Sequence, residues 1–305
     1  MNKKSIKIIA AFLGIALFAY LFISYQIIHS LVSGNPRPLG EYTMADDVHA
    51  EDISFSPRED SFKLSGWYLS HKEREESLAT LIFVHGINTN RLSGPDTLNI
   101  ATDLVREGFD VVMFDLRAKG KSEGPYSSAS YFERLDILGA FDYLRFERGI
   151  SENKIGILGF SMGAAASILA TKDEPLVQAL VVDSPFADAR KLVTQEAGIA
   201  MGLDTIYVKA FIPMVKFLAR SLYGINLDQM VPEEAVKDIK FPILIIHGDK
   251  DDRVKIENSQ AIYKNANPEC KLEVFEDCGH TNAYSLDKER YLNLIISYFK
   301  DRLTR

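Results

Sequence analysis

A serine-containing turn between a strand-like run and a helix-like run constrains this chain more than any other stretch. Residues 154–158 form a short run that is apolar after Lys154 and predicts a buried strand. Residues 159–163 read Gly-Phe-Ser-Met-Gly, and the residues that follow are small and helix-forming. In that context a G-x-S-x-G turn holds its serine clear of the backbone, at the positive end of a helix dipole. Gly159 and Gly163 leave out side chains where strand and helix would collide with the turn. The pattern predicts a nucleophile at Ser161, against the simpler interpretation of a glycine-rich turn with a capping serine.

Strand and helix patterns alternate along the rest of the chain. Continuous apolar runs bounded by helices indicate a mostly parallel sheet covered on both faces. We therefore predict an α/β fold with about eight strands. The expected strands are residues 52–56, 62–69, 81–84, 110–114, 154–158, 180–182, 243–246 and 272–275, and the expected helices include 98–107, 131–146 and 291–301.

Candidate functional residues lie just after these strands, because ligands of such sheets bind at the carboxyl ends of the strands. After Ser161, an aspartate-rich loop follows the strand at 243–246, and His280 follows the last strand. Serine, acid and histidine thus occur in an order that differs from the two best-known serine protease orders. His280 is the expected general base, whereas His85 and His247 stand in His-Gly turns and are expected to be structural.

These motifs give the chain a resemblance to the α/β-hydrolase superfamily over about residues 50–300. The G-x-S-x-G turn, H-G-x-x at His85, H-G-x-x-D-x-x-V at His247 and Gly-His at His280 occur in the expected order. Residues 115–122 look like the D-x-R-x-x-G-x-S segment common in these enzymes. With its apolar N-terminus, the chain is similar to the Bem46-like membrane-associated serine hydrolases. It also resembles a group of generally described bacterial hydrolases, and neither likeness indicates a substrate.

Three aspartates compete for the role of the acid that orients His280. The H-G-x-x-D-x-x-V match favours Asp251, and Asp252 is its main rival, while Asp249 is expected to be a solvated turn residue. A metal site is the other interpretation of this cluster, but the loop lacks the glycine and the distal glutamate of an EF-hand. Neither a metal nor an organic cofactor is expected.

Attack by a serine on a carbonyl also needs N–H donors for the oxyanion. The residue after the nucleophile, Met162, supplies one, and the resemblance implies Ile87 as the other. The chain lacks the H-G-G-G form found in some lipases. Asn88 and Asn90 are nearby polar residues that we do not assign to this role.

The N-terminus predicts a membrane anchor. Lys3, Lys4 and Lys7 precede an almost wholly apolar run at 8–28, which is long enough to cross a bilayer. A cleaved signal peptide is the alternative, but its apolar core would be shorter and a small-residue cleavage site would follow. The lysines favour a cytoplasmic N-terminus with the catalytic domain outside the membrane. The alternative location is secretion after cleavage.

The expected organisation is an anchor at residues 1–30, a linker at 31–49 and a hydrolase domain at 50–305. An insertion at about 187–240 is too long for a simple strand–helix connection and is expected to form a helical cap over the strand ends. Its expected helices are residues 189–201, 203–212 and 214–222, followed by a short one that begins at Pro232. Cap packing with a solvated basic edge is one interpretation of Lys209, Lys216 and Arg220. Contact with the bilayer is the other.

Composition excludes some partners. The 305 residues are 47% hydrophobic and 25% charged, which is ordinary for a globular protein. A net charge of −7 argues against a nucleic-acid partner. Cys270 and Cys278 flank a predicted strand, and the eight extended steps between them would cover about 26 Å at about 3.3 Å per residue, too far for a disulfide. The redox compartment and the oligomeric state stay open.

Three classes of function remain. The first is a serine hydrolase that cleaves carboxylic esters or thioesters of small-molecule or lipid-like acyl substrates through an acyl-enzyme. The second is an amide or peptide hydrolase with the same triad. The third is a non-catalytic binding protein on a hydrolase fold. The intact set of Ser161, Asp251 and His280 favours an enzyme.

Overall fold

The computed structural model describes residues 2–33, 37–92 and 96–304. These residues form two units. The larger unit contains Gly34–Asp188 and Val231–Arg305, and the smaller contains Met1–Ser33 and Ala189–Met230. The N-terminal helix therefore belongs to the same unit as most of the predicted insertion. Of the predicted linker, residues 34–36 lie outside the described residues.

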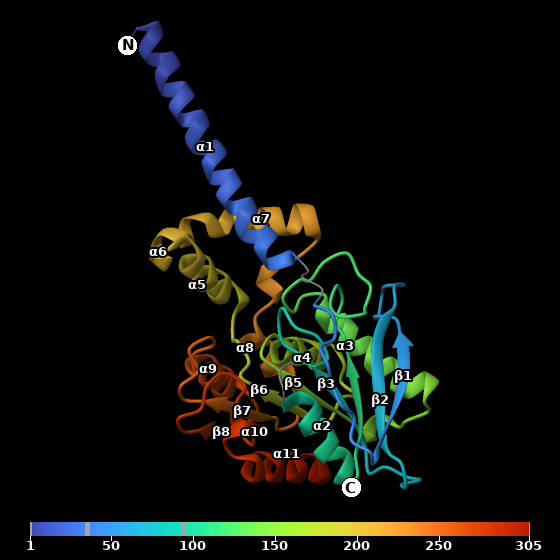
Figure 1. Cartoon of the computed structure of the whole chain (residues 1–305). Coiled ribbons are helices and arrows are strands. Elements are labelled where there is room, and N and C mark those ends of the chain that lie inside the picture. The colour runs from blue at the N-terminus through green and yellow to red at the C-terminus, as the bar shows by residue number, and fades with distance from the viewer. Residues whose placement is uncertain (1, 34–36, 93–95, 305) are drawn as a thin grey trace. The chain divides into compact units, whose positions relative to one another are not determined.

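The larger unit is built on an eight-stranded sheet with the order β1-β2-β4-β3-β5-β6-β7-β8 (Figure 1). β1 pairs with β2, and β2 with β4, in antiparallel fashion, and the remaining pairs are parallel. The predicted mostly parallel α/β sheet is confirmed. The strands are β1 Val48–Phe55, β2 Leu64–His71, β3 Thr80–Val84, β4 Asp110–Phe114, β5 Ile155–Phe160, β6 Leu180–Asp183, β7 Leu244–Gly248 and β8 Lys271–Phe275.

Helices cover both faces of this sheet. β3, β5 and β6 are buried along their whole length, as continuous apolar strands must be. On one face, Leu81, Phe83 and Leu158 pack with side chains of α2 and α11. On the opposite face, α4 packs against β5 and β6, and α3 packs beside α4. The helices of this unit are α2 Asp96–Arg106, α3 Glu133–Asp142, α4 Met162–Asp173, α8 Pro232–Ala235, α9 Glu257–Asn265, α10 Ala283–Leu286 and α11 Lys288–Leu303.

Most element boundaries differ from the expected ones by a few residues. β1 begins at Val48 rather than at residue 52, because its whole length pairs with β2. The helix expected at 131–146 ends its regular part at Asp142 and continues as a π-helical turn, Tyr143–Glu147. α11 begins three residues early, because the Asp287 side chain caps it by accepting a hydrogen bond from the Arg290 N–H.

The smaller unit contains α1 Lys3–Val32, α5 Ala189–Met201, α6 Thr205–Val208 and α7 Ile212–Tyr223 (Figure 1). α1 is long and apolar enough to cross a membrane. Within this unit α1 packs mainly against α7 and also contacts α5.

The second expected helix of the insertion, residues 203–212, is shorter than predicted. Gly202 has a φ of 63° and ends α5, and Asp204 caps α6 by accepting a hydrogen bond from the Ile206 N–H at 2.9 Å. A 3₁₀ turn at Lys209–Phe211 then leads into α7, which has Pro213 in its first turn, a position that proline favours. The expectation that the insertion covers the strand ends stays a prediction.

Candidate active site

Ser161 occupies a strained turn between β5 and α4. Its φ of 55° and ψ of −119° lie outside the regions that non-glycine residues normally adopt. The Ser161 N–H donates to the Asp183 carbonyl at 2.8 Å, which ties the turn to the end of β6. The predicted sharp turn is therefore present, with its serine directly before the N-terminus of α4.

Close backbone approach explains both glycines of the motif. A Cβ on Gly163 would lie 2.3 Å from the Val84 carbonyl oxygen, and one on Gly159 would lie 2.7 Å from the Ala164 Cα. Real Cβ atoms do not approach so closely, so neither position accepts a side chain without displacing the backbone. The two glycines let α4 pack directly onto β3 and β5 beneath the serine.

A hydrogen-bonded chain links Ser161, His280 and Asp251. The Ser161 Oγ lies 2.8 Å from His280 Nε2, and His280 Nδ1 lies 2.6 Å from Asp251 Oδ2. Asp251 is buried, whereas Asp252 is exposed. Burial acts to raise the pKa of Asp251, but the hydrogen bonds from His280 and from the Val254 N–H outweigh it, so the pKa lies below its ordinary value. Asp251 is thus held as an anion against the imidazole.

Backbone contacts hold the acid and the histidine in place. The Asp249 N–H donates to the Phe275 carbonyl at 3.0 Å, and the Lys250 N–H donates to the Cys278 carbonyl at 2.9 Å. These bonds join the loop after β7 to the loop after β8. Gly248 permits the contact, because a Cβ there would lie 2.3 Å from the Cys278 carbonyl oxygen.

His85 and His247 are buried and hold loops. His85 Nε2 accepts from the Leu116 N–H at 3.0 Å, and its Nδ1 lies 2.8 Å from the Gly86 carbonyl. His247 Nε2 lies 2.7 Å from the Val254 carbonyl, so it closes the loop that carries Asp251. Burial lowers the pKa of both imidazoles, which keeps them neutral.

A cavity of about 340 Å³ opens beside the serine. Its lining includes Ser161, His280, Ile87, Arg37 and Arg253. A Cβ on Gly86 would lie 3.3 Å from the Ser161 Cβ, so the loop that carries Ile87 passes directly beside Ser161. Met162 is the first residue of α4. Asn88 also lines the cavity.

Asn90, named above beside the oxyanion donors, holds the linker instead. Its side-chain amide donates to the carbonyls of Arg37 and Pro38, at 3.2 and 3.1 Å. These bonds hold residues 37 and 38 of the linker against the loop after β3. Asn90 therefore positions Arg37 at the cavity.

The D-x-R-x-x-G-x-S segment is a buried scaffold. The Asp115 carboxylate accepts from Arg91 and from the Lys121 N–H, each at 2.8 Å. Gly120 has a φ of 48°, and a Cβ there would collide with Asp115. Ser122 donates to the Asp115 carbonyl. The segment holds Leu116 in reach of His85 and so supports the loop beside Ser161.

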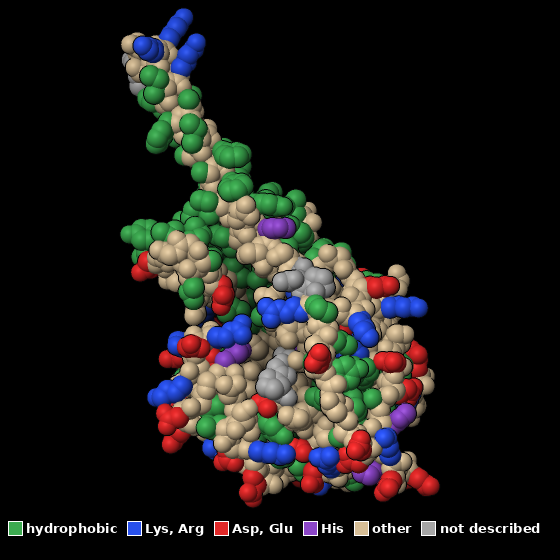
Figure 2. Space-filling model, viewed as in Figure 1, with side chains coloured by type: hydrophobic (Ala, Val, Ile, Leu, Met, Phe, Trp, Pro, Cys, Tyr) green, Lys and Arg blue, Asp and Glu red, His purple; other side chains and the backbone are tan. Residues whose placement is uncertain are grey.

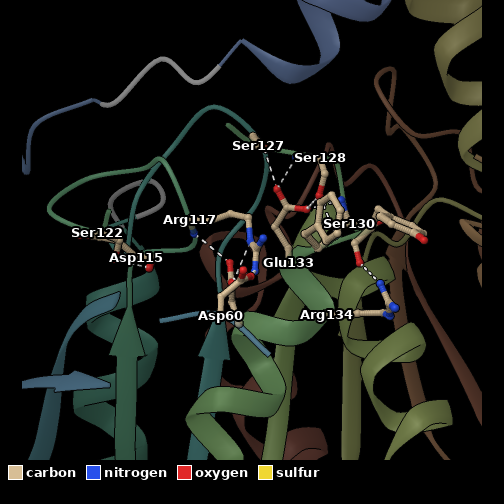
Figure 3. Close-up of polar contacts among 12 residues, drawn as sticks. Asp60, Asp115, Arg117, Ser122, Ser127, Ser128, Ser130, Glu133 and Arg134 are labelled. Atoms are coloured by element: carbon tan, nitrogen blue, oxygen red, sulfur yellow. Dashed lines mark hydrogen bonds and ion pairs between the residues drawn. The ribbon is translucent and has the colours of Figure 1, made fainter. Parts of the chain in front are cut away.

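Arg117 points away from Asp115 into a second network at the start of α3 (Figure 3). Its guanidinium lies 2.7 Å from the buried Asp136 and 3.0 Å from Asp60. Glu133, also buried, accepts from the side chains or N–H groups of the neighbouring serines Ser127, Ser128 and Ser130. This network fixes the residues between β4 and α3.

Replacing Arg117 by methionine is expected to lower the free energy of unfolding by about 3 kcal/mol, because it leaves Asp136 buried without its cation. Burial already raises the pKa of Asp136 to about 7, and Arg117 opposes that rise. Arg134→Met, which breaks an exposed pair with Asp173, is the matched control and should cost about 1 kcal/mol or less. Urea unfolding at neutral pH measures both. Equal losses of unfolding free energy in the two variants would contradict the stabilising role of the buried pair between Arg117 and Asp136.

The sequence interpretation gave no role to several buried ionisable residues, Asp183 and Lys119 among them. Asp183 ends β6, and burial raises its pKa to about 6 although the hydroxyls of Ser184 and Tyr291 donate to it. An aspartate at the carboxyl end of a buried strand was the available signal. Lys119 is buried, and among the described residues its Nζ has no hydrogen-bond partner. Burial lowers the pKa of Lys119.

Comparison with known proteins agrees with this geometry. Residues 75–222 match the family described as serine aminopeptidase, S33. An esterase of Pyrococcus furiosus, Pf2001, superposes with a TM-score of 0.69 at 26% identity, over 88% of this chain and 100% of the esterase. The chain belongs to the α/β-hydrolase superfamily. It is a hydrolase with a serine-hydrolase-type fold, as the sequence predicted.

Two curated relatives extend the comparison. The chain is 25% identical to the uncharacterized protein YfhR of Escherichia coli O157:H7, over 97% of this chain and 96% of that protein. It is 26% identical to the lysophosphatidylserine lipase ABHD12 of Macaca fascicularis, over 63% of this chain and 46% of the lipase. The first likeness includes the N-terminal segment, and the second is limited to a part of each chain.

Proposed function

We propose that this protein is a membrane-anchored serine hydrolase that cleaves carboxylic esters or thioesters through an acyl-enzyme. The observation that carries the proposal is the hydrogen-bonded chain from Ser161 through His280 to Asp251, with distances of 2.8 and 2.6 Å. A serine hydroxyl is a weak nucleophile until a base accepts its proton. His280 is in position to do so, and Asp251 holds the tautomer that leaves Nε2 free to accept.

The proposed reaction has two halves. The Ser161 Oγ attacks the acyl carbon as its proton passes to His280 Nε2, and the oxyanion binds the N–H groups of Met162 and Ile87. Collapse of this intermediate breaks the bond to the leaving alcohol or thiol, which takes the proton from His280. Water then attacks the acyl-enzyme with His280 again as base. It releases the acid and restores the Ser161 hydroxyl.

Two arginines beside the nucleophile support an anionic substrate. Arg37 and Arg253 line the same cavity as Ser161 and His280. A guanidinium is well suited to bind phosphate or carboxylate groups. The related lipase is named for lysophosphatidylserine, an anionic acyl ester. We infer that the substrate carries a negative group near the ester that is cleaved.

The location follows from the N-terminal helix. α1 is long and apolar enough to span a bilayer. Lys3, Lys4 and Lys7 at its start favour a cytoplasmic N-terminus. The larger unit then lies on the opposite side of the membrane. Alkaline carbonate extraction of membranes tests the anchor, since a processed secreted form would be released.

The full-length protein in detergent tests the activity. p-Nitrophenyl esters from acetyl to palmitoyl measure turnover, and a fluorophosphonate probe reports the activated serine. We expect ester hydrolysis and labelling of Ser161, and the preferred chain length separates a small-ester enzyme from a lipid enzyme. Turnover without labelling of Ser161 would contradict the proposed nucleophile.

Replacing Arg253 by glutamine is expected to lower the preference for anionic substrates. The ratio of kcat/KM for a lysophosphatidylglycerol to that for a lysophosphatidylcholine of the same acyl chain should fall about tenfold, the worth of one charge-assisted contact. Arg253→Lys retains the charge and is the matched control. An identical ratio in all three proteins would contradict a role for this arginine in substrate choice.

An amide substrate is the second candidate, and the description of the matched family as a serine aminopeptidase supports it. The same triad serves both reactions. Hydrolysis of aminoacyl p-nitroanilides, together with labelling of Ser161 but no turnover of esters, would favour this alternative.

A further inference from the structure

From Tyr20 onwards, one face of α1 packs against the helices of the insertion. The Tyr20 hydroxyl donates to the Ala210 carbonyl at 3.0 Å, and its ring stacks on Phe211 with centroids 5.3 Å apart. On α7, Val215 and Ala219 are fully buried one turn apart, and α1 packs on this helix. The covered positions of α1 recur at helical spacing: Tyr20, Ile23, Ser24, Ile27, Ile28, Leu31 and Val32. α1 and the insertion helices are therefore one packed assembly.

The free part of α1 is too short to cross a bilayer alone. After Lys7, the apolar residues 8–19 are exposed all round. These 12 residues span about 18 Å at about 1.5 Å each, whereas the hydrocarbon core is about 30 Å thick. Tilting the helix only reduces the thickness that it covers. About 12 Å of the core must then be filled by the part of α1 that packs against the insertion.

The surface of this packed part is apolar. Beyond Tyr20, the uncovered face of α1 presents Leu21, Phe22 and Tyr25. The insertion exposes more large hydrophobic side chains in its 42 residues than the whole described part of the larger unit does. Figure 2 shows hydrophobic side chains gathered along α1 and over the insertion helices. The exposed insertion residues are Ile199, Leu203, Ile206, Tyr207, Phe217 and Leu222.

We propose that α5, α6 and α7 are embedded in the lipid bilayer beside α1. The inference goes beyond the proposed chemistry and rests only on the anchor proposed above. The chain bends by 116° between α5 and the α6–α7 segment, which suits helices that enter one leaflet and return rather than cross. Helices meet the requirement of hydrocarbon for satisfied backbone groups. Contiguous exposed apolar surface of this kind marks a membrane contact.

The charges of the insertion suit the edge of such a site. Arg190, Lys191, Lys209 and Lys216 line a cavity of about 820 Å³ in this unit. Lysine and arginine extend their charged ends to the headgroup layer while their stems stay in apolar surroundings. Asp228 pairs with Lys216 at 2.6 Å and with Arg190 at 3.3 Å, which balances part of the charge. Of the three basic residues that the sequence places on one edge, Lys209 and Lys216 line this cavity and Arg220 does not.

Environment-sensitive probes test the embedding in the full-length protein. Single cysteines at Ile206 and Phe217 would carry a nitrobenzoxadiazole label, in vesicles of phosphatidylcholine with phosphatidylglycerol. Phe12→Cys on α1 is the lipid reference. Phe146→Cys, an equally exposed phenylalanine of the larger unit, is the aqueous reference. Cys270 and Cys278 are buried, and wild-type labelling corrects for them. Thermal unfolding followed by circular dichroism checks that each variant is folded.

Spin-labelled lipid is expected to quench the probes at Ile206 and Phe217 as it does the probe at Phe12, at least about twofold more than at Phe146. Iodide should quench only the Phe146 probe. If Phe12 is in lipid but Ile206 and Phe217 respond as Phe146 does, the embedding is wrong and the anchor stands. If iodide also quenches the Phe12 probe, the anchor fails and the embedding fails with it.

Discussion

Replacing Ser161 by alanine is expected to lower kcat for ester hydrolysis by about 10⁵-fold, because removal of a nucleophile in an interdependent triad eliminates the acyl-enzyme route. Only stabilisation by the oxyanion donors and by substrate binding would remain. The measurement is steady-state turnover of a p-nitrophenyl ester by the full-length protein in detergent. Loss of fluorophosphonate labelling should accompany the loss of turnover.

Ser167→Ala is the matched control for this experiment. Ser167 is buried on α4, and its hydroxyl donates to the Gly163 carbonyl at 2.7 Å, so it belongs to the same helix but not to the hydrogen-bonded chain. Its replacement should change kcat less than about threefold, as a single neutral hydrogen bond contributes to stability rather than to the reaction. Equal turnover by wild type and Ser161→Ala would exclude Ser161 as the nucleophile.

Asp251→Asn should lower kcat by about 10⁴-fold without unfolding the protein, because the asparagine can present an N–H to His280 Nδ1 and so favour the wrong tautomer. Nε2 would then carry the proton and could not accept the one from Ser161. Asp251 Oδ1 also accepts from the Arg253 and Val254 N–H groups, at 2.9 and 2.8 Å. Those bonds survive if the asparagine places its carbonyl oxygen there, which preserves the loop.

The neighbouring Asp252→Asn provides the comparison. Asp252 is exposed, so its replacement should alter kcat/KM less than about threefold. Parallel measurement of kcat/KM for both variants, with thermal unfolding to show intact folds, decides between the two aspartates. A larger loss for Asp252→Asn would reverse the assignment of the acid.

Local patterns were sufficient for the central sheet. The buried strands of the larger unit are mostly apolar runs with polar residues at their ends, because a strand buried on both faces is surrounded by apolar neighbours. The role of Gly159 and Gly163 could also be predicted from the sequence. A serine turn needs both glycines only where the backbones of strand and helix approach each other closely. The positions of Ser161 and His280 at strand ends followed from the order of the runs, and the structure brings the two side chains together.

Local patterns failed where tertiary contacts determine a role. Asp183 has the ordinary appearance of a strand-end residue, and only its complete burial gives it a raised pKa. Arg37 stands in a stretch that is a linker by composition. It reaches the cavity because Asn90, 53 residues later, holds its carbonyl. The 3₁₀ turn at Lys209–Phe211, which interrupts the expected helix 203–212, likewise depends on packing. A short capped helix and a longer helix differ little in free energy, so tertiary contacts decide between them.

The sequence by itself determined the α/β sheet, the serine turn and the apolar N-terminal helix, because strand burial, close backbone approach and bilayer thickness each impose a local composition. The motif match favoured Asp251 over Asp252, but only the tertiary structure decided which carboxylate lies against His280, because the direction of each side chain depends on how the loop is packed. It alone decided that α1 packs with the insertion in one unit. Segments separated by more than 150 residues carry no local sign that they will meet, because their contact depends on the folding of everything between them.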